Sequence, residues 1–280
     1  MFRYRSRTLV LEIVMILVTL AMLSPFWLLI MTSFKPGEDV LQTPAFQPPK
    51  HPTLDNFKSL LESSNGASST ILKGLENSLI ITAGSVIGLI AFGSITAYAL
   101  VRTKSRWTNR SYFLFLIAII LPTQLGVLPL YVEARNLGLV GSRIGMIVVY
   151  TGVLLPLAVF LYAGFFKTLD PEYEEAARID GASKFQTFLR VVFPLMGPAT
   201  GTVAILAGLI VWNDFFTSLI FLNGSDVQTL PVVMYNYVGS LVSQWNLVFA
   251  IVLLSMLPIL AFYIVAQRRF IQGFSGGLKG

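Results

Sequence analysis

Six long apolar segments constrain the fold of this chain more than any other feature. They lie near residues 9–31, 76–101, 111–131, 143–166, 198–222 and 246–267. A transmembrane α-helix needs about 17 to 25 largely apolar residues, and it satisfies its own backbone hydrogen bonds where water is absent. The composition agrees, because only 12% of the residues are charged, against about 25% in soluble domains. The sequence therefore predicts an all-α integral membrane protein with six transmembrane helices, forming a single domain over residues 1–280.

The basic residues predict the orientation of these helices. Membrane proteins carry an excess of Lys and Arg in their cytoplasmic loops. An even number of spans puts both termini on one side, and 14 of the 20 basic residues then share that side. We therefore expect both termini and the loop at 167–197 to be cytoplasmic. The net charge of +6 then reflects membrane topology, and no nucleic-acid partner is expected.

The predicted cytoplasmic loop contains signals for two short helices. Asp170 is suited to the N-cap of the first helix, and Gly181 to the C′ position that ends it. Ser183 and Gln186 have the spacing of a capping box, which starts the second helix. We expect Pro194 to end that helix. The loop is thus predicted as a helix, a glycine joint and a second helix at the membrane surface.

This loop resembles the EAA loop of binding-protein-dependent ABC importer permeases. That family pattern is Glu-Ala-Ala, then Gly six residues after the Glu, and finally Ile-x-Leu-Pro. Here the triplet is Glu175-Ala176-Ala177 and the glycine is Gly181, while Val191 and Phe193 replace the Ile and Leu before Pro194. The segment Asp180-Gly181-Ala182 also matches the form common in the carbohydrate-uptake branch. The resemblance implies an ATPase-coupling role for six residues: Glu175, Ala176, Ala177, Asp180, Gly181 and Ala182.

The resemblance extends to the end of the chain and implies an assembly. A tail with Gly276, Gly277 and Lys279 is similar to that of maltose-type permease subunits, where it reaches the ATPase dimer. The implied partners are a second homologous permease, two cytoplasmic ABC ATPase subunits that bind ATP and Mg, and an external solute-binding protein. The implied function is import of a sugar, either a di- or an oligosaccharide, through the lipid bilayer. The implied location is the cytoplasmic membrane of a bacterium or archaeon.

One carboxylate lies deep in an apolar segment. Asp214 follows Trp212 and Asn213 in the fifth segment, and an ionisable residue at such depth is costly and faces the bundle interior or water. Two interpretations remain: these residues line the translocation pathway, or Asp214 is a polar clasp between helices. In the second segment, Gly84 and Gly88 have a spacing that permits close helix packing.

The loop from 32 to 75 is polar and rich in proline. It has no apolar periodicity of its own that would build a domain. It is interpreted as a surface connector, or alternatively as the contact surface for the external binding protein.

Other chemistries are disfavoured by what the sequence lacks. It has no P-loop motif, no cysteine and one histidine, His51, so no ATP, metal or other cofactor is expected on this chain. No Ser-His-Asp arrangement is possible around that histidine, and an enzyme is not expected. The alternatives are an ABC permease for another small solute, such as a polyol, a glycerol phosphate or an amino acid, or an ion-coupled secondary transporter. The last of these would need inverted repeats and several buried charges.

Overall fold

The computed structural model describes residues 6–62, 67–103, 105–238 and 244–277. Within this part the regular structure is entirely helical. Four stretches are long and apolar enough to cross a membrane, and two bent helix pairs raise that number to six if each pair is one span. The four stretches are Thr8–Ser33, Ile71–Arg102, Arg143–Thr168 and Trp245–Ile264. The prediction of an all-α membrane protein is therefore confirmed.

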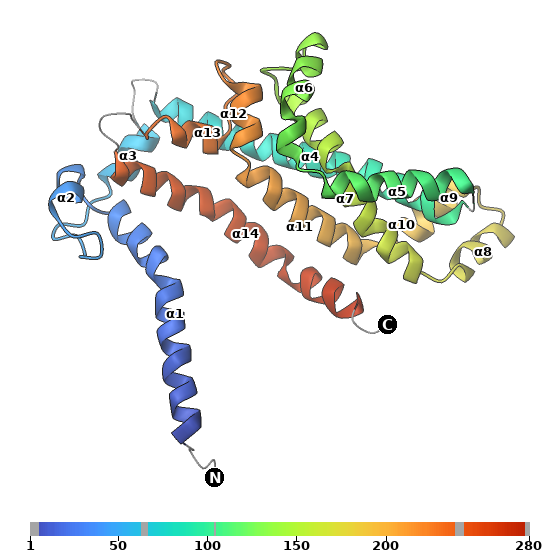
Figure 1. The fold of residues 1–280 in the computed structure, drawn as a ribbon, viewed down its shortest axis with the longest axis horizontal. Coiled ribbons are helices and arrows are strands. Elements are labelled where there is room, and N and C mark those ends of the chain that lie inside the picture. Colours follow the sequence, from blue (N-terminus) through green and yellow to red (C-terminus); the bar gives the residue numbers. More distant parts are fainter. Residues whose placement is uncertain (1–5, 63–66, 104, 239–243, 278–280) are drawn as a thin grey trace. The chain divides into compact units, whose positions relative to one another are not determined.

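The helices follow one another with short connections (Figure 1). In chain order they are α1 (Ser6–Ser33), α2 (Gly37–Gln42), α3 (Asp55–Glu62), α4 (Ala67–Arg102), α5 (Arg106–Ile120), α6 (Thr123–Asn136), α7 (Arg143–Thr168), α8 (Glu172–Ile179), α9 (Lys184–Thr187), the π-helix η1 (Phe188–Val192), α10 (Phe193–Leu195), α11 (Gly197–Asn213), α12 (Phe216–Leu222), α13 (Leu230–Tyr235) and α14 (Trp245–Gly277).

The chain packs as two compact units. The first comprises Met1–Leu72 and Val233–Pro258, and the second comprises Lys73–Val232 and Ile259–Gly280. Helices α1 to α3 belong to the first unit and α5 to α12 to the second, whereas α4, α13 and α14 have residues in both.

In the first unit, the polar loop after α1 is folded around an asparagine. The Asn56 amide donates to the carbonyls of Ser33 and Lys35 at 2.7 and 2.8 Å, and it accepts from Asn246 at 2.7 Å. The Lys35 side chain is 1% exposed, and its ammonium donates to the Thr43 hydroxyl at 3.0 Å. Some of the polar groups of this loop are therefore used inward, where they fix its conformation.

Helix α1 is apolar on all sides. Its large side chains are exposed along most of the helix, with Leu17 60% and Met22 70% accessible, and burial begins only near its end, at Leu29. A helix of this kind is stable only when lipid or another protein covers it. This surface fits the predicted first span.

In the second unit, α7 lies at the centre and packs against α5, α6 and α11. Helix α4 approaches it closely through glycines. A methyl group on Gly84, Gly88 or Gly93 would lie 2.5, 2.7 or 2.8 Å from the nearest atom of α7. The close packing expected from the Gly84 and Gly88 spacing is therefore confirmed, because side chains of α7 occupy the space that a Cβ on these glycines would need.

The third predicted segment, 111–131, is not one helix, and this expectation was wrong. Helix α5 ends at Ile120, α6 begins at Thr123, and the two are bent by 105°. Pro122 is the cause, because proline disfavours helical geometry in the residue before it and cannot donate a backbone hydrogen bond. Leu121 is accordingly extended, with ψ 129°.

The fifth predicted segment, 198–222, is also broken. Helix α11 ends at Asn213, and α12 begins at Phe216. Asp214 between them is extended, with ψ 116°. The apolar composition predicted one continuous span, and it gave no sign that the carboxylate interrupts the helix.

The second surface helix ends at Leu195, one residue after Pro194 and close to the end that the sequence had suggested. It continues from α9 through η1 and α10, and the chain then turns by 74° into α11. In the π-helix each amide bonds five residues back, as Phe193 N–H does to Phe188 O. A π-helical turn of this kind shifts the backbone hydrogen-bond pattern by one residue. The helix therefore continues past Pro194, although this residue has no N–H to donate.

The last helix is longer than predicted. Helix α14 runs to Gly277, past the expected end near 267, so the backbone of Gly276 and Gly277 is helical. Lys279 lies outside the described residues.

Candidate functional sites

The surface helix α8 ends in a left-handed glycine, as predicted. Gly181 has φ +82°, and the amides of Gly181 and Ala182 donate to the carbonyls of Arg178 and Ala177, both at 3.0 Å. These two bonds form a Schellman motif, which satisfies the carbonyls at the helix end. A φ in this region disfavours any residue with a Cβ, whereas nothing lies within 4 Å of Gly181 to oppose a side chain sterically. Only the backbone conformation therefore requires glycine here.

The second half of this surface hairpin also begins as predicted. The Ser183 hydroxyl accepts from the Gln186 amide at 3.3 Å, and the Gln186 side chain accepts from the Ser183 amide at 2.9 Å. Asp170 accepts from the Glu172 amide at 3.0 Å, which caps the start of α8. The hairpin from Asp170 to Gln186 is therefore held by its own local hydrogen bonds at three points.

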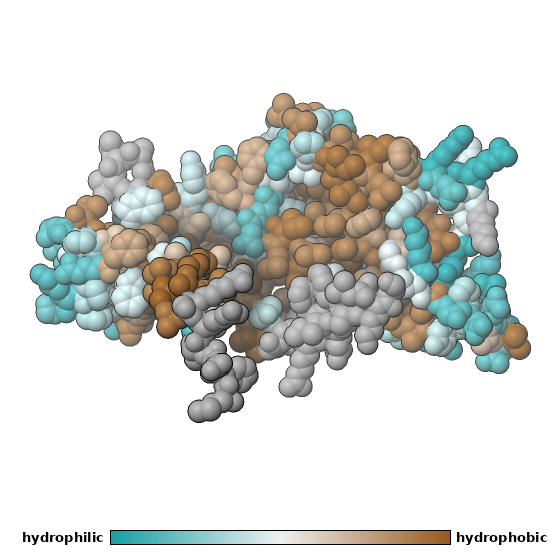
Figure 2. Space-filling model, turned by 60° about the horizontal axis from the view of Figure 1, so that its bottom comes forward, coloured by the Kyte–Doolittle hydropathy of each residue, from teal (hydrophilic) through white to brown (hydrophobic). Residues whose placement is uncertain are grey.

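The residues of the EAA-like pattern divide between two faces of the hairpin. Glu175, Ala176 and Asp180 are exposed, while Ala177 is 9% exposed and turned inward. Figure 2 shows hydrophilic side chains gathered over the end of the second unit that carries α8 and α9, beside hydrophobic surface on the neighbouring helices. The exposed side of α8 therefore combines carboxylates with two large apolar side chains, Tyr173 and Ile179, which are 54% and 87% exposed, and with the small residue Ala176.

A buried cluster that the sequence pattern did not predict holds the inward face of α8. The Glu174 side chain is 2% exposed and forms a salt bridge with Arg102 of α4 at 2.6 Å. The Tyr98 hydroxyl donates to the second carboxylate oxygen at 2.9 Å, and the Arg102 guanidinium also donates to the Leu169 carbonyl at 3.0 Å. We call Tyr98, Arg102 and Glu174 the Glu174 cluster.

A second polar cluster joins the N-terminal parts of α4 and α7. Arg143 donates to the Asn77 side-chain oxygen at 2.7 Å and forms a salt bridge with Glu76 at 2.9 Å. The Asn77 amide donates to the Gln228 carbonyl at 2.9 Å. We call Glu76, Asn77 and Arg143 the Asn77 cluster. The nearby Ser78 hydroxyl accepts from the Leu230 amide at 2.8 Å.

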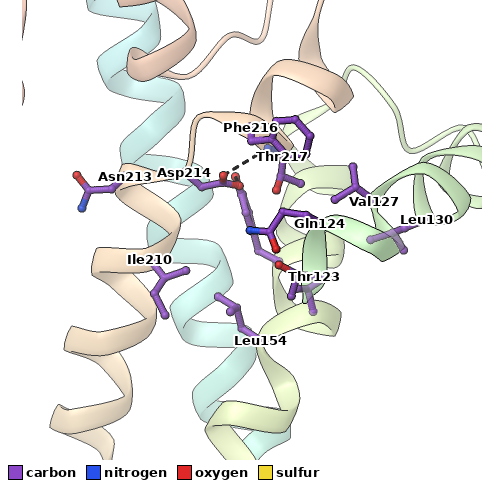
Figure 3. Close-up of a pocket in the computed structure, with 12 residues that line it drawn as sticks. Thr123, Gln124, Val127, Leu130, Leu154, Ile210, Asn213, Asp214, Phe216 and Thr217 are labelled. Atoms are coloured by element: carbon purple, nitrogen blue, oxygen red, sulfur yellow. Dashed lines mark hydrogen bonds between the residues drawn. The ribbon is translucent and has the colours of Figure 1, made fainter. Parts of the chain in front are cut away.

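The break between α11 and α12 opens onto a pocket of about 250 Å³ (Figure 3). Residues of α6, α7, α11 and α12 line it, together with the break itself: Thr123, Gln124, Val127, Leu130, Tyr150, Val153, Leu154, Ile210, Asn213, Asp214, Phe216 and Thr217. Asp214 is the only charged residue in this lining. The pocket therefore combines an apolar wall with a carboxylate, two side-chain amides and several hydroxyl groups.

Hydrogen bonds position the Asp214 carboxylate. One oxygen accepts from the Tyr150 hydroxyl at 2.8 Å. The other accepts from the Thr217 amide at 3.3 Å (Figure 3). The Tyr150 oxygen is also 2.9 Å from the buried Ser218 hydroxyl. Because tyrosine has one proton and gives it to Asp214, Ser218 must donate to Tyr150. Asp214 is thus a clasp between α7 and the start of α12, and it also lines a pocket.

The other two residues predicted beside Asp214 differ from it. The Asn213 side chain points away from Asp214 and donates to the Leu209 carbonyl at 2.8 Å (Figure 3). Trp212 is 8% exposed and does not line the pocket. Gln124 and Thr123, which no sequence pattern identified, project from the start of α6 towards the pocket instead (Figure 3). In the described part of the chain, no three His, Cys, Asp or Glu side chains come together as a metal site.

The sequence matches a known protein family over residues 89–275, a range that includes the surface hairpin and the pocket. The family is described as the binding-protein-dependent transport system inner membrane component. The chain belongs to this family. It is therefore a multi-pass permease component of the cytoplasmic membrane that works with a solute-binding protein.

Individual relatives agree over nearly the whole chain. The melibiose/raffinose/stachyose import permease protein MelC of Bacillus subtilis is 37% identical, over 91% of this chain and 91% of MelC. The probable starch degradation products transport system permease protein AmyC of Thermoanaerobacterium thermosulfurigenes is 32% identical, over 94% and 93%. In a bacterial ABC transporter that imports alginate, a solved chain has a TM-score of 0.83 at 23% identity, covering 96% of this chain and 99% of that one. This last match supports the fold.

Proposed function

We propose that this permease imports a neutral di- or oligosaccharide as one transmembrane subunit of an ABC importer. The observation that carries the proposal is the 37% identity, over 91% of the chain, to a permease named for melibiose, raffinose and stachyose. A polyol, glycerol phosphate or amino acid substrate is the alternative that the experiment below addresses.

The energy source lies on other subunits. The sequence has no P-loop, so ATP and Mg bind to two cytoplasmic ABC ATPase subunits and this chain performs no catalysis. A second homologous permease completes the membrane part, and an external binding protein delivers the sugar. The orientation proposed from the basic residues places both termini and the surface hairpin on the ATPase side.

The segment from Glu175 to Ala182 couples ATP hydrolysis to transport. Its exposed surface combines the carboxylates of Glu175 and Asp180 with the apolar side chain of Ile179, which is 87% exposed, and this combination suits insertion into a groove of a partner. Glu175 and Asp180 are exposed and can accept charge-assisted hydrogen bonds from basic groups of the ATPase. The tail residues Gly276, Gly277 and Lys279 provide a second ATPase contact.

The pocket at Asp214 lies on the translocation pathway and contacts the sugar. A carboxylate that accepts two hydrogen bonds retains lone pairs that can accept from sugar hydroxyls. Within the described part of the chain, the Gln124 side chain has no hydrogen-bond partner, so it is available to a ligand. No Lys or Arg lines the pocket to neutralise an anionic sugar, and the lining therefore favours a neutral substrate. Asn213 also lines this pocket, whereas Trp212 acts beside the pathway.

An uptake assay in a deletion strain tests the function. Cells that lack this chain are complemented with the parental gene and supplied with labelled raffinose, maltotriose, an alginate oligosaccharide, glycerol 3-phosphate and an amino acid mixture. We expect the chain to restore uptake of a neutral oligosaccharide alone. Restoration of amino acid or glycerol phosphate uptake, without any sugar, would contradict the proposal.

Two substitutions test the pathway role of the pocket. Gln124→Ala removes no hydrogen bond within the described chain, so we expect normal assembly and a raised KM for sugar uptake. Tyr150→Phe is the matched control for the clasp, since it removes the bond to Asp214 and leaves the carboxylate in the pocket. An unchanged KM in Gln124→Ala, together with reduced complex in Tyr150→Phe, would leave Asp214 with the clasp role only.

A further inference from the structure

We propose that the Glu174 cluster locks α8 to the end of α4, so that Tyr98, Arg102 and Glu174 act as positioning residues for coupling. When a partner displaces α8, this lock transmits the displacement to α4 and α7. The inference rests on the coupling role proposed for α8, and it adds three residues outside the segment from Glu175 to Ala182.

The first step in the argument is the number of bonds that meet at one carboxylate. Glu174 uses both oxygens, one with the Arg102 guanidinium at 2.6 Å and one with the Tyr98 hydroxyl at 2.9 Å. Arg102 uses its planar fork to hold the Leu169 carbonyl as well, at 3.0 Å. A planar group bound at two points is fixed in orientation as well as in distance. Three elements, α4, α8 and the end of α7, are thereby joined through two side chains of α4.

The second step is the burial of the carboxylate. The Glu174 side chain is 2% exposed, so water cannot replace the hydrogen bonds of its carboxylate if Arg102 or Tyr98 moves away. A buried charge that loses its partner is strongly unfavourable, which makes separation of α8 from α4 costly compared with movement of both together. The nearest other cation, Arg178 on α8 itself, is 3.8 Å away and is more than half exposed, so it is a weaker partner.

The third step is the packing behind the cluster. The Tyr98 ring lies 5.7 Å from the Phe166 ring of α7 and 5.0 Å from the Phe188 ring of η1. One side chain of α4 therefore contacts the last turns of α7, the hairpin helix η1 and the carboxylate of α8. The close contact of Gly93 with Ala158 then ties α4 to α7 one turn further in. Energetic coupling travels through contiguous packed groups of this kind.

The test uses the complete complex in proteoliposomes, with raffinose as the probe if it is the sugar taken up. Glu174→Gln keeps the shape of the side chain and removes its charge, and Tyr98→Phe keeps the ring packing and removes one donor. We expect the binding protein to stimulate ATP hydrolysis less in both variants, and the sugar imported per ATP to fall about fivefold or more in Glu174→Gln. The matched control is Glu172→Gln, an exposed carboxylate of the same helix, which should behave as the parent.

The outcomes separate this inference from the proposed function. Parental sugar-to-ATP ratios in both Glu174→Gln and Tyr98→Phe would overturn the positioning role of the Glu174 cluster. If substitutions at Glu175 or Gly181 still uncoupled transport from ATP hydrolysis, the coupling role proposed for the segment from Glu175 to Ala182 would stand. If none of these substitutions changes the ratio, the coupling role of α8 itself fails. Arg102→Lys provides a further check, because it keeps the charge and loses the fork. We expect it to rescue complex yield relative to Arg102→Ala without restoring the ratio.

Discussion

The two polar clusters of the second unit use the same chemistry in different surroundings. Each joins an arginine to a glutamate, at 2.6 Å in the Glu174 cluster and 2.9 Å in the Asn77 cluster. The glutamate side chain is 2% exposed in the first and 55% exposed in the second. Water screens the exposed pair, and such pairs are worth about 0 to 1 kcal/mol. Distance alone therefore does not rank the two salt bridges, whereas burial does.

The two clusters differ in which group is buried. In the Glu174 cluster the carboxylate of the charged pair is buried, so loss of its arginine partner would leave that charge uncompensated in an apolar interior. In the Asn77 cluster the buried group is neutral. Asn77 is 1% exposed, and it bridges Arg143 and the Gln228 carbonyl. The first arrangement suits a joint that has to transmit force, and the second suits a static attachment.

The largest effect we expect is in topology, because labelling is all-or-none. The orientation rule puts the Glu174 cluster on the cytoplasmic side and the Asn77 cluster on the outside. In this cysteine-free chain, Asn223→Cys should react with an impermeant thiol reagent in intact cells, and Lys184→Cys only after permeabilisation. Both positions are exposed in the structure. Labelling of Lys184→Cys in intact cells would reverse the assignment of the two ends.

Next in size is the effect of the glycine joint beside the Glu174 cluster. Gly181→Val forces a β-branched residue into φ +82°, at a cost of about 1 to 3 kcal/mol, and should misplace α8. We expect stimulation of ATP hydrolysis by the loaded binding protein to be largely lost, with assembled complex still present. Gly181→Asn is the matched control, since asparagine tolerates this conformation. If both variants lost stimulation of ATP hydrolysis equally, the positive φ of residue 181 would not be the cause of the loss.

A smaller effect comes from the glycines of α4, which lie between the two clusters. The Cβ of Gly93→Ala would meet the Ala158 Cβ at 2.8 Å, whereas that of Gly84→Ala would meet the Ile147 Cδ1 at 2.5 Å. The Ala158 methyl cannot rotate away, but the end of Ile147 can. We expect Gly93→Ala to cost about 1 to 3 kcal/mol, seen as a lower Tm of the purified complex, and Gly84→Ala to cost less.

Gly164→Ala is the control for that pair, because nothing lies within 4 Å of the methyl group it would add. Its Tm should equal or exceed that of the parent, since alanine favours the helix over glycine. A larger loss in Gly84→Ala than in Gly93→Ala would contradict the packing argument.

The smallest effect is expected within the Asn77 cluster. Glu76→Gln removes an exposed charge and should change stability by less than about 1 kcal/mol, with the difference disappearing in high salt. Asn77→Ala removes a buried bridge and should cost about 1 to 3 kcal/mol at any salt concentration. Thermal unfolding of both variants at low and high ionic strength measures this. If Glu76→Gln lost as much stability as Asn77→Ala, the charged pair, and not the buried amide, would be the main source of stability in this cluster.

Much of the surface hairpin was predictable because its determinants are local. The left-handed Gly181 and the capping box of Ser183 and Gln186 each depend on residues within one helical turn. The helix breaks at Leu121 and Asp214 were missed for a different reason. A hydropathy pattern measures whether a segment is apolar, and it does not record whether the backbone stays helical through a proline or a carboxylate.

The hydrogen-bonded side-chain pairs between helices could not be predicted from the sequence. Tyr98 and Arg102 reach Glu174 across 76 and 72 residues, and Tyr150 reaches Asp214 across 64. Each of these residues has many possible partners at such separations, and only the packing of α4 and α7 selects one. The sequence by itself determined which segments are long and apolar enough to cross a membrane and how the hairpin is capped, since apolar length and capping act over short distances. The tertiary structure alone decided which carboxylate is buried, because burial depends on how close the helix backbones come.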